Sequence, residues 1–303
     1  MTDEFRPTSW HEYIGQEDAK DSLDMSIQSA LARRERMDHV FLYGPPGSGK
    51  TSLAGVIAHR LRLDLKAVVM PLSDTALKAL VMQNHGVVLM DEIHRASKKQ
   101  QEGLLTLLED GELSQPSGFN IPNHDLMIIG ATTERGKVIK PLYDRFLIKP
   151  EFDPYTEDQM AAIAFGMLKR AGLHQRYDME FAKALGLAAG GVPRNVKSMV
   201  VAVRDLISSG REAQPTIDHV LKARNVTHDG LTRLHIDYLT AMGKNGGAAL
   251  GLKTLCSQIQ ASEEMVTEAE TLLFQRGFIL YTKSGRELTA EGWKRANALL
   301  GQT

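Results

Sequence analysis

The sequence is poor in cysteine and carries almost no net charge. Cys256 is the single cysteine among 303 residues, which excludes an intramolecular disulfide framework and a zinc site built from paired cysteines. Lysine and arginine (36) nearly balance aspartate and glutamate (37), so the net charge is −1. No global basic field favours nucleic acid, and any such site must be a local patch.

Long hydrophobic runs are also missing. No stretch approaches the roughly 20 apolar residues that a membrane span needs, and the first residues, MTDEFRPTSWHEY, contain no apolar signal core. We therefore expect a cytoplasmic protein that does not contact a membrane. The hydrophobic share of 43% and charged share of 24% are those of an ordinary globular protein, and the length allows two or three domains.

The strongest local pattern is HVFLYGPPGSGKTSL. A short apolar strand, Val40–Tyr43, precedes a match to G-x-x-x-x-G-K-[ST], and helical spacing follows. Glycines let backbone amides turn toward a polyphosphate, and the helix N-terminus adds partial positive charge. Lys50 would meet the β and γ phosphates of ATP, and the Thr51 hydroxyl would bind Mg²⁺. The nucleotide-binding residues expected here are Gly44, Pro45, Pro46, Gly47, Ser48, Gly49, Lys50, Thr51 and Ser52.

A pair of acids follows a second apolar strand. In GVVLMDEIHR, Val87–Met90 is predicted as a buried strand, with Asp91 and Glu92 at its carboxyl end. Ligands of open α/β sheets bind at that edge. Asp91 is therefore the expected Mg²⁺ carboxylate, and Glu92 the residue that orients or deprotonates the attacking water. The neighbouring His94 receives no chemical role, since a lone histidine is more often a local hydrogen-bonding residue.

A third strand, residues 126–130 (LMIIG), ends in Ala131-Thr132-Thr133. A hydroxyl at such a strand end can contact the γ-phosphate or the attacking water, although threonine is also a common strand residue. Further along, PLYDRF contains Arg145. A lone arginine is usually a surface cation whose stem covers apolar neighbours.

Taken in order, six segments resemble those of AAA+ ATPases: RPTSWHEYIGQ, DHVFLYGPPGSGKT, VVLMDEIHR, IIGATTERG, PLYDRF and GGVPRNVK. The wording of DEIHR and GATT is more closely similar to the RuvB family, the bacterial Holliday-junction branch-migration motors. The resemblance runs from about Arg6 to near the C-terminus.

The resemblance implies further roles. Tyr13 and Ile14 match the segment that packs on adenine, and Thr133, with Thr132 as the alternative, matches sensor 1. Arg145 matches the arginine finger, which acts on ATP bound to the next subunit of a homo-oligomeric ring, expected to be hexameric on DNA. In VPR, Pro193 and Arg194 match sensor 2, which reads the γ-phosphate. The implied catalytic set is Lys50, Glu92, Thr133, Arg145 and Arg194.

The expected fold is an α/β P-loop AAA+ core over residues 1–152, an all-helical lid over 153–226 and a winged-helix domain over 227–303. Thr156 and Gln159 predict a capping box for a helix at 157–170. Lid helices are expected near 179–189, 194–208 and 216–223. The last domain is read as helices at 231–242, 252–260 and 263–275, strand 277–282, turn 283–286, return strand 287–289 and helix 290–299.

Charge predicts where this last domain meets DNA. Helix 263–275, in the recognition position, carries Glu263, Glu264, Glu268 and Glu270, which would repel phosphate. Residues 275–295 instead hold five basic side chains against two acids. We therefore expect Lys283 and Arg286 to contact double-stranded or four-way-junction DNA through its phosphates. Ordinary surface cations in a solvated turn are the alternative.

Two departures from the RuvB pattern stand out. The stretch EDGELSQPSGFNIPNHDLMIIG is shorter than expected and lacks the alternating apolar hairpin that docks the partner RuvA, and Tyr143 stands where PLRDRF has its first arginine. The expected function is an ATP-dependent DNA motor of the RuvB type. One alternative is a clamp-loader-like or helicase-loader-like ATPase that remodels a protein on DNA; the shortened hairpin favours it, and the winged domain argues against it. Another is a non-catalytic nucleotide switch, which would need neither Glu92 nor Arg145.

Overall fold

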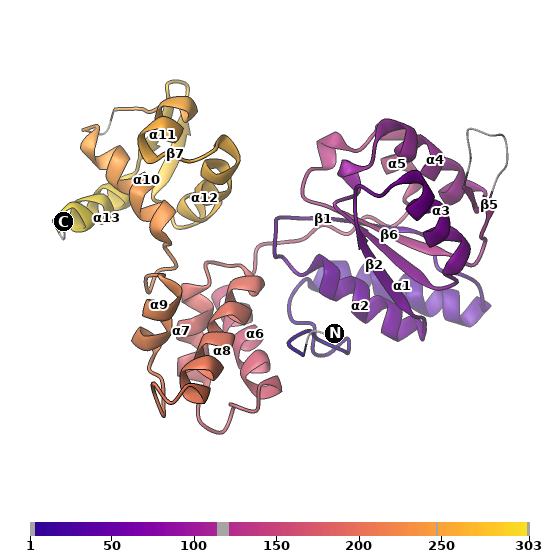
Figure 1. Ribbon diagram of the computed structural model, residues 1–303, viewed down its shortest axis with the longest axis horizontal. Coiled ribbons are helices and arrows are strands. Elements are labelled where there is room, and N and C mark those ends of the chain that lie inside the picture. The colour runs from indigo at the N-terminus through magenta and orange to yellow at the C-terminus, as the bar shows by residue number, and fades with distance from the viewer. Residues whose placement is uncertain (1–3, 114–120, 247, 302–303) are drawn as a thin grey trace. The chain divides into compact units, whose positions relative to one another are not determined.

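The computed structural model describes residues 4–113, 121–246 and 248–301, and the chain divides into two compact units (Figure 1). The first holds the chain up to Gln159 together with Lys169–Ala171 and Val192–Arg194. The second holds the rest of the middle region and the C-terminal region.

A four-stranded parallel sheet forms the centre of the first unit, in the order β1-β6-β3-β2. Its strands are β1 (Val40–Tyr43), β2 (Leu65–Val69), β3 (Val87–Asp91) and β6 (Met127–Thr132). The three strands predicted from the sequence are confirmed, although two run one or two residues further than expected. Strand β2 was missed: its sequence LKAVV contains an apolar run, but the strand lies at the sheet edge and its residues are partly or fully exposed.

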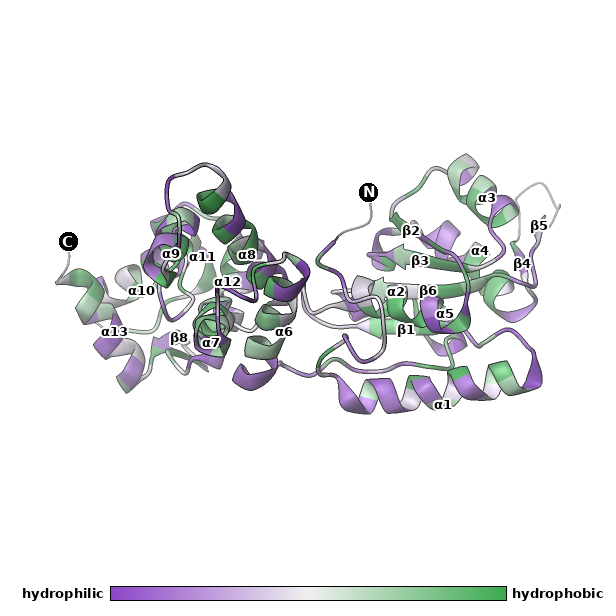
Figure 2. Cartoon of the chain, turned by 90° about the horizontal axis from the view of Figure 1, so that it is seen from below, coloured by the Kyte–Doolittle hydropathy of each residue, from purple (hydrophilic) through white to green (hydrophobic). Residues whose placement is uncertain are grey.

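Helices cover both faces of this sheet (Figures 1 and 2). Alternate strand residues point to opposite sides, so Phe41 and Val88 join one apolar cluster while Leu42 and Leu89 join the other. Helices α1 (Glu17–Arg33) and α2 (Lys50–Leu61) cover one face; α3 (Asp74–Gln83), α4 (Lys98–Glu109) and α5 (Lys140–Arg145) cover the other. Burial on both sides explains the continuous apolar strand sequences.

Short elements complete the first unit. The 3₁₀ turns η1 (Ile93–Arg95) and η2 (Arg135–Lys137) follow β3 and β6. Strands β4 (Glu112–Leu113) and β5 (Ile121–Pro122) pair antiparallel and form the base of a hairpin. Whether this stretch lacks the alternating apolar hairpin of the RuvB family stays a prediction. The intervening residues 114–120 lie outside the described residues.

The middle region is all helical. It contains α6 (Glu157–Arg170), α7 (Met179–Ala188), α8 (Pro193–Ser208) and α9 (Ile217–Arg224), close to the predicted positions. The predicted capping box is confirmed: the Thr156 amide donates to Gln159 Oε1 at 2.9 Å, and the Gln159 amide donates to Thr156 Oγ1 at 3.2 Å.

The C-terminal region is a winged-helix domain with its own apolar core. It contains α10 (Arg233–Lys244), α11 (Leu252–Ile259), α12 (Glu263–Gln275), β7 (Ile279–Thr282), β8 (Gly285–Leu288) and α13 (Ala290–Leu300). One boundary was wrong. Arg286 was expected in the turn, but it pairs with Tyr281 inside the β7–β8 ladder, so the turn is only Lys283-Ser284.

Candidate active site

The P-loop connects β1 to α2 at the carboxyl edge of the sheet. Gly47 and Gly49 have φ of 74° and 102°, a region that residues with a Cβ rarely adopt. Gly49 is the N-cap of α2 and supplies no side chain to its first amides. Those N–H groups therefore remain available to an anion, in line with the helix dipole.

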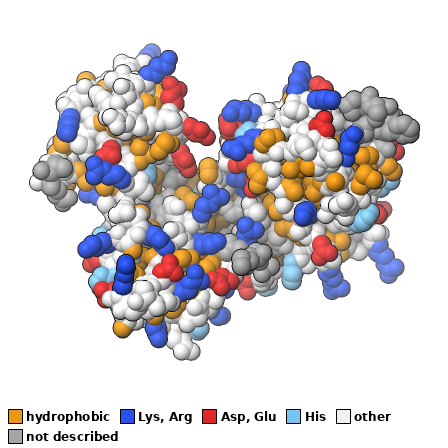
Figure 3. Space-filling view, viewed as in Figure 1, with side chains coloured by type: hydrophobic (Ala, Val, Ile, Leu, Met, Phe, Trp, Pro, Cys, Tyr) orange, Lys and Arg blue, Asp and Glu red, His pale blue; other side chains and the backbone are white. Residues whose placement is uncertain are grey.

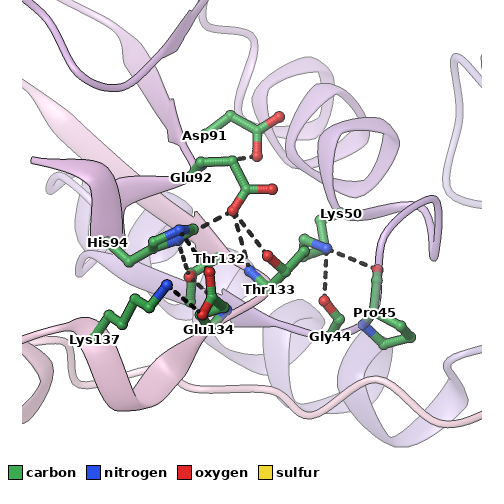
Figure 4. Close-up of polar contacts among 10 residues, drawn as sticks. All are labelled: Gly44, Pro45, Lys50, Asp91, Glu92, His94, Thr132, Thr133, Glu134 and Lys137. Atoms are coloured by element: carbon green, nitrogen blue, oxygen red, sulfur yellow. Dashed lines mark hydrogen bonds and ion pairs between the residues drawn. The ribbon is translucent and has the colours of Figure 1, made fainter. Parts of the chain in front are cut away.

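Lys50 is buried in this loop (Figure 4). Its Nζ donates to the carbonyl oxygens of Gly44 at 2.8 Å and Pro45 at 2.9 Å. Burial lowers the pKa of Lys50, while the charges of Glu92 and Asp91 oppose that shift. The nearby Ser48 hydroxyl is buried without a hydrogen-bond partner among the described residues. A partly desolvated cation beside an unsatisfied hydroxyl suits a phosphate ligand.

The predicted acids stand at the end of β3, beside the P-loop and the end of β6. Thr51 Oγ1 donates to Asp91 Oδ2 at 3.4 Å. Glu92 has a left-handed backbone (φ 50°, ψ 47°), uncommon for a residue with a side chain. Its Oε2 accepts from the Thr133 amide at 3.3 Å and from Thr133 Oγ1 at 3.1 Å. The two strand ends singled out in the sequence are thus brought together.

Sequence reasoning gave His94 no role, yet its ring lies among these groups (Figure 4). Nδ1 is 2.8 Å from Thr132 Oγ1 and 3.2 Å from Glu92 Oε2, while Nε2 is 3.2 Å from Glu134 Oε1. The left-handed Glu92 starts the single turn η1 and so directs His94 back toward β6. The position of His94 two residues after Glu92, the acid at the strand end, is the sequence feature that could have identified it.

Tyr13 lies beneath the P-loop. It is 3% exposed, its hydroxyl is 3.5 Å from the Gly49 carbonyl oxygen, and burial raises its pKa well above the usual value. The adjacent Ile14 is half-buried. Tyr155, which sequence reasoning missed, donates from its hydroxyl to the Ser48 carbonyl oxygen at 2.9 Å. Its position 107 residues further along the chain left no local pattern to find.

Pro193 and Arg194 begin α8, and the first compact unit includes both. A Cβ placed on Gly47 would lie 2.7 Å from Val192 Cγ1 and 3.2 Å from Arg194 Cβ. Only a glycine fits at this approach, and the predicted sensor arginine lies against the predicted phosphate loop.

Arg145 ends α5 and contacts a different element. Its Nε donates to Glu109 Oε2, on α4, at 2.9 Å, and the side chain is 42% exposed. The adjacent Tyr143 packs edge-on against Phe41, with Lys149 Nζ 4.7 Å from its ring centre. Arg145 is therefore held at the surface by an acid and not by a group of the P-loop.

The wing holds fewer available cations than the sequence suggested. Lys283 is exposed at the turn, but Arg286 Nε and Nη2 donate to the two oxygens of Glu270 at 2.8 and 3.2 Å. The other basic side chains counted there also have partners: Arg276 with the Leu187 carbonyl, Arg295 with Asp229 and Lys294 with Glu291. Lys283 is thus the better candidate for a phosphate contact.

The acids of α12 also divide into two kinds. Glu263, Glu264 and Glu268 are exposed, and Figure 3 shows acidic side chains gathered over this helix. Glu270 is 1% exposed and points inward, so it does not contribute to that surface. The expected repulsion of phosphate by the recognition helix therefore rests on three acids instead of four.

Comparisons with known proteins extend over almost the whole chain. Residues 5–152 match the family model for the Holliday junction DNA helicase RuvB P-loop domain, and residues 228–297 match the RuvB C-terminal winged helix domain. The Holliday junction branch migration complex subunit RuvB of Lactobacillus gasseri is 35% identical, covering 95% of this chain and 89% of that protein. For the same subunit of Campylobacter hominis the values are 31%, 94% and 88%.

Solved structures give the same result. The Thermotoga maritima RuvB Holliday junction branch migration motor superposes with a TM-score of 0.81 at 31% identity, covering 97% of this chain and 99% of that one. The parallel sheet, P-loop, helical middle and winged helix define a P-loop ATPase of the AAA+ class. Within that class, the chain belongs to the RuvB family. In the described part of the chain, no helix is long and apolar enough to span a bilayer.

Proposed function

We propose that this protein is an ATP-driven DNA motor that moves four-way junctions in recombination and repair. The observation that carries the proposal is the meeting of Lys50, Asp91, Glu92 and Thr133 at one sheet edge, in a chain that also carries a winged-helix domain. Full-length similarity to branch-migration subunits and motors supports the choice of substrate.

In this proposal the P-loop holds the phosphates of ATP. Backbone amides at the start of α2 and the Lys50 ammonium bind the β and γ phosphates, which restores the interactions that burial removes from the lysine. Tyr13 and Ile14 lie on the adenine side, and Arg194, beside Gly47, reads the γ-phosphate. The domain boundaries proposed are those of the three expected segments, 1–152, 153–226 and 227–303.

The donor set also fits Mg²⁺. The Thr51 hydroxyl and Asp91 carboxylate are oxygen ligands at hydrogen-bond distance from each other. The described residues contain no cluster of three or more histidine, cysteine or acidic side chains that could hold a metal. Mg²⁺ sites that pair one or two protein oxygens with substrate phosphates need no such cluster. Thr51 and Asp91 would hold the ion, which would supply positive charge to offset that of the phosphates.

Glu92 is the proposed group that orients the attacking water, and Thr133 senses the γ-phosphate. Arg145 is proposed to act in trans, on the nucleotide of the next subunit in a hexameric ring. Lys283 contacts the DNA backbone from the wing. Coupling to a RuvA-like partner through the β4–β5 hairpin is outside this proposal.

Three proteins test it on a synthetic four-way junction, with ATP hydrolysis, ATP affinity and junction dissociation measured side by side. The unaltered protein should hydrolyse ATP faster with the junction present and convert it to duplex products. Glu92→Gln should bind ATP but hydrolyse it about 10²–10⁴-fold more slowly, the usual contribution of a positioned acid or base. Lys50→Ala should lose tight ATP binding.

Lys66→Ala is the matched control, since Lys66 is an exposed lysine on the sheet edge in the same unit. It should behave as the unaltered protein in all three measurements. Hydrolysis by Glu92→Gln at the unaltered rate would refute the assignment of the carboxylate. Robust ATPase activity with no junction movement would refute the motor function and favour a remodelling ATPase.

A further inference from the structure

The imidazole of His94 lies between two carboxylates, and its side chain is only 5% exposed. Nδ1 points at Glu92 and Thr132, and Nε2 points at Glu134 (Figure 4). Glu92, His94 and Glu134 thus form a row of polar contacts, and it continues to Lys137, whose Nζ is 2.7 Å from the second Glu134 oxygen. A buried ring with polar neighbours at both nitrogens has a fixed orientation.

The contacts to Glu92 converge on one atom. Oε2 meets the Thr133 amide, the Thr133 hydroxyl and His94 Nδ1. Three neighbours on Oε2 fix the rotation of the carboxylate and leave Oε1 for another donor, such as a water. The backbone that carries it is left-handed, so the side chain starts from an unusual direction and depends on these contacts for its position.

Donor roles follow from the surrounding atoms. Thr132 Oγ1 already accepts the Glu134 amide hydrogen at 2.9 Å, and its remaining lone pair can accept another. A hydrogen on Nδ1 is therefore shared by Thr132 and the negative Glu92. Holding Glu92 through Nδ1 and Glu134 through Nε2 needs a hydrogen on each ring nitrogen, since both carboxylates only accept; the protonated ring carries both hydrogens.

We infer that His94 is a positioning residue for ATP hydrolysis, which holds Glu92 through Nδ1–H while Glu134 holds the ring through Nε2. The inference rests on the proposed role of Glu92. If the Thr133 hydroxyl turns to the γ-phosphate, Glu92 loses one of its contacts. His94 then keeps the carboxylate from following the threonine, so Oε1 stays aimed at the water.

Two substitutions separate the functions of the two ring nitrogens. The amide nitrogen of asparagine lies near the place of Nδ1, and that of glutamine reaches the place of Nε2. His94→Asn should keep the contact to Glu92 and retain kcat within about threefold. His94→Gln should lower kcat about 10–100-fold, because misplacement of a reacting group by about 1 Å can cost 10²-fold. The affinity for a fluorescent ATP analogue should stay within about twofold for both.

If His94 had only a structural role, the two substitutions would lower kcat equally, or ATP binding would weaken together with kcat. Either result would overturn the inference. Lys137→Ala, at the far end of the row, is the control and should leave kcat unchanged. If either His94 variant fails to fold, Glu134→Ala tests the inference instead, because Glu134 is exposed and its replacement should not disturb folding. It should reduce kcat about three- to tenfold, and an unchanged rate would also overturn the inference.

The same measurements distinguish this inference from the proposed function. If Glu92→Gln hydrolyses ATP normally, the proposed role of Glu92 fails and the inference fails with it. If Glu92→Gln is inactive but His94→Gln is as fast as the unaltered protein, the proposed function stands and only the role of His94 is refuted.

Discussion

At the scale of single residues, the wing shows how a buried acid can pair with a nearby cation and so make it unavailable to DNA. Glu270 accepts from the hydroxyls of Tyr238 and Tyr281 at 2.9 and 2.8 Å and from the Arg286 guanidinium. Burial, and then the contact with Glu270, raises the pKa of Tyr281 to about 12, so both phenols remain donors. Removing one partner of such a group leaves a charge without compensation in a dry site.

We therefore expect Arg286→Ala and Lys283→Ala to fail in different ways. Arg286→Ala should lose about 3–5 kcal/mol of stability, because Glu270 is left unpaired. Lys283→Ala should change stability by less than about 0.5 kcal/mol and lower the log–log salt slope of DNA binding by about 0.9, the share of one phosphate contact. Urea denaturation and salt-dependent binding to duplex DNA measure the two effects.

Lys294→Ala provides the matched control, since Lys294 is an exposed lysine of the same domain with Glu291 nearby. Its DNA affinity should match that of the unaltered protein. Equal weakening by Lys283→Ala and Lys294→Ala would place the DNA contact on general surface charge and not on the wing turn.

The sequence predicted the positions of side chains that follow strand ends, while their roles stay predictions. Lys50, Asp91 and Thr133 were placed beside one another because carboxyl ends of parallel strands share an edge. Tyr155 and the Arg286–Glu270 pair could not be placed in this way. Their contacts join residues 107 and 16 positions apart, and depend on how the chain folds back. Counting charges along the sequence could not tell a paired arginine from an available one.

At the scale of elements, apolar runs and caps predicted the buried strands and the middle helices closely. Strand β2 has an apolar run, LKAVV, that the sequence analysis did not assign to a strand. The β4–β5 pair was missed because two-residue strands are too short to carry an apolar pattern. A polar contact also helps to join β1 to β6. His39, just before β1, accepts the Ile128 amide hydrogen on Nδ1 at 2.9 Å and is 4% exposed.

This histidine predicts a pH dependence of stability. Burial, assisted by the Arg36 charge, lowers the pKa of His39 from 6.5 to about 3. The unfolded chain therefore binds a proton more readily than the folded one, and the free energy of unfolding falls as pH drops below 6.5. Between about pH 7.5 and about pH 5 this group should remove about 2 kcal/mol.

Urea denaturation at both pH values measures the effect as a difference between variants. His39→Asn keeps an acceptor near Nδ1 but cannot take up a proton, so its stability should fall by about 2 kcal/mol less than that of the unaltered protein. His85→Asn, at an exposed position, should leave the pH dependence unchanged. The same acid-induced loss in all three proteins would show that His39 is not the responsible group.

At the scale of the whole molecule, Arg145 pairs with Glu109 on α4, an element outside the P-loop. The Glu109 contact joins side chains that are 42% and 53% exposed. Such surface ion pairs contribute only about 0–1 kcal/mol. The guanidinium can therefore leave Glu109 at little cost for a phosphate, with which it forms a charge-assisted and geometrically matched pair.

A trans role for Arg145 makes a specific prediction for mixed rings. Arg145→Ala should lower ATPase activity about 10³–10⁵-fold, and Arg145→Lys should fail nearly as badly because an ammonium lacks the bidentate fork. Lys50→Ala should also be inactive, with an unaltered Arg145. Mixing Arg145→Ala with Lys50→Ala should restore activity, because at some interfaces an intact pocket then meets an intact Arg145.

Activity plotted against the mixing ratio distinguishes the three possible roles, after mass measurements with ATP confirm that both variants assemble. A trans role gives a maximum at intermediate ratios, since interfaces of the productive orientation are most frequent there. A role in cis leaves every mixture inactive, because each subunit then lacks one part of its own site. If Arg145 were only the surface partner of Glu109, Arg145→Ala would be active alone, and activity would fall steadily as Lys50→Ala is added.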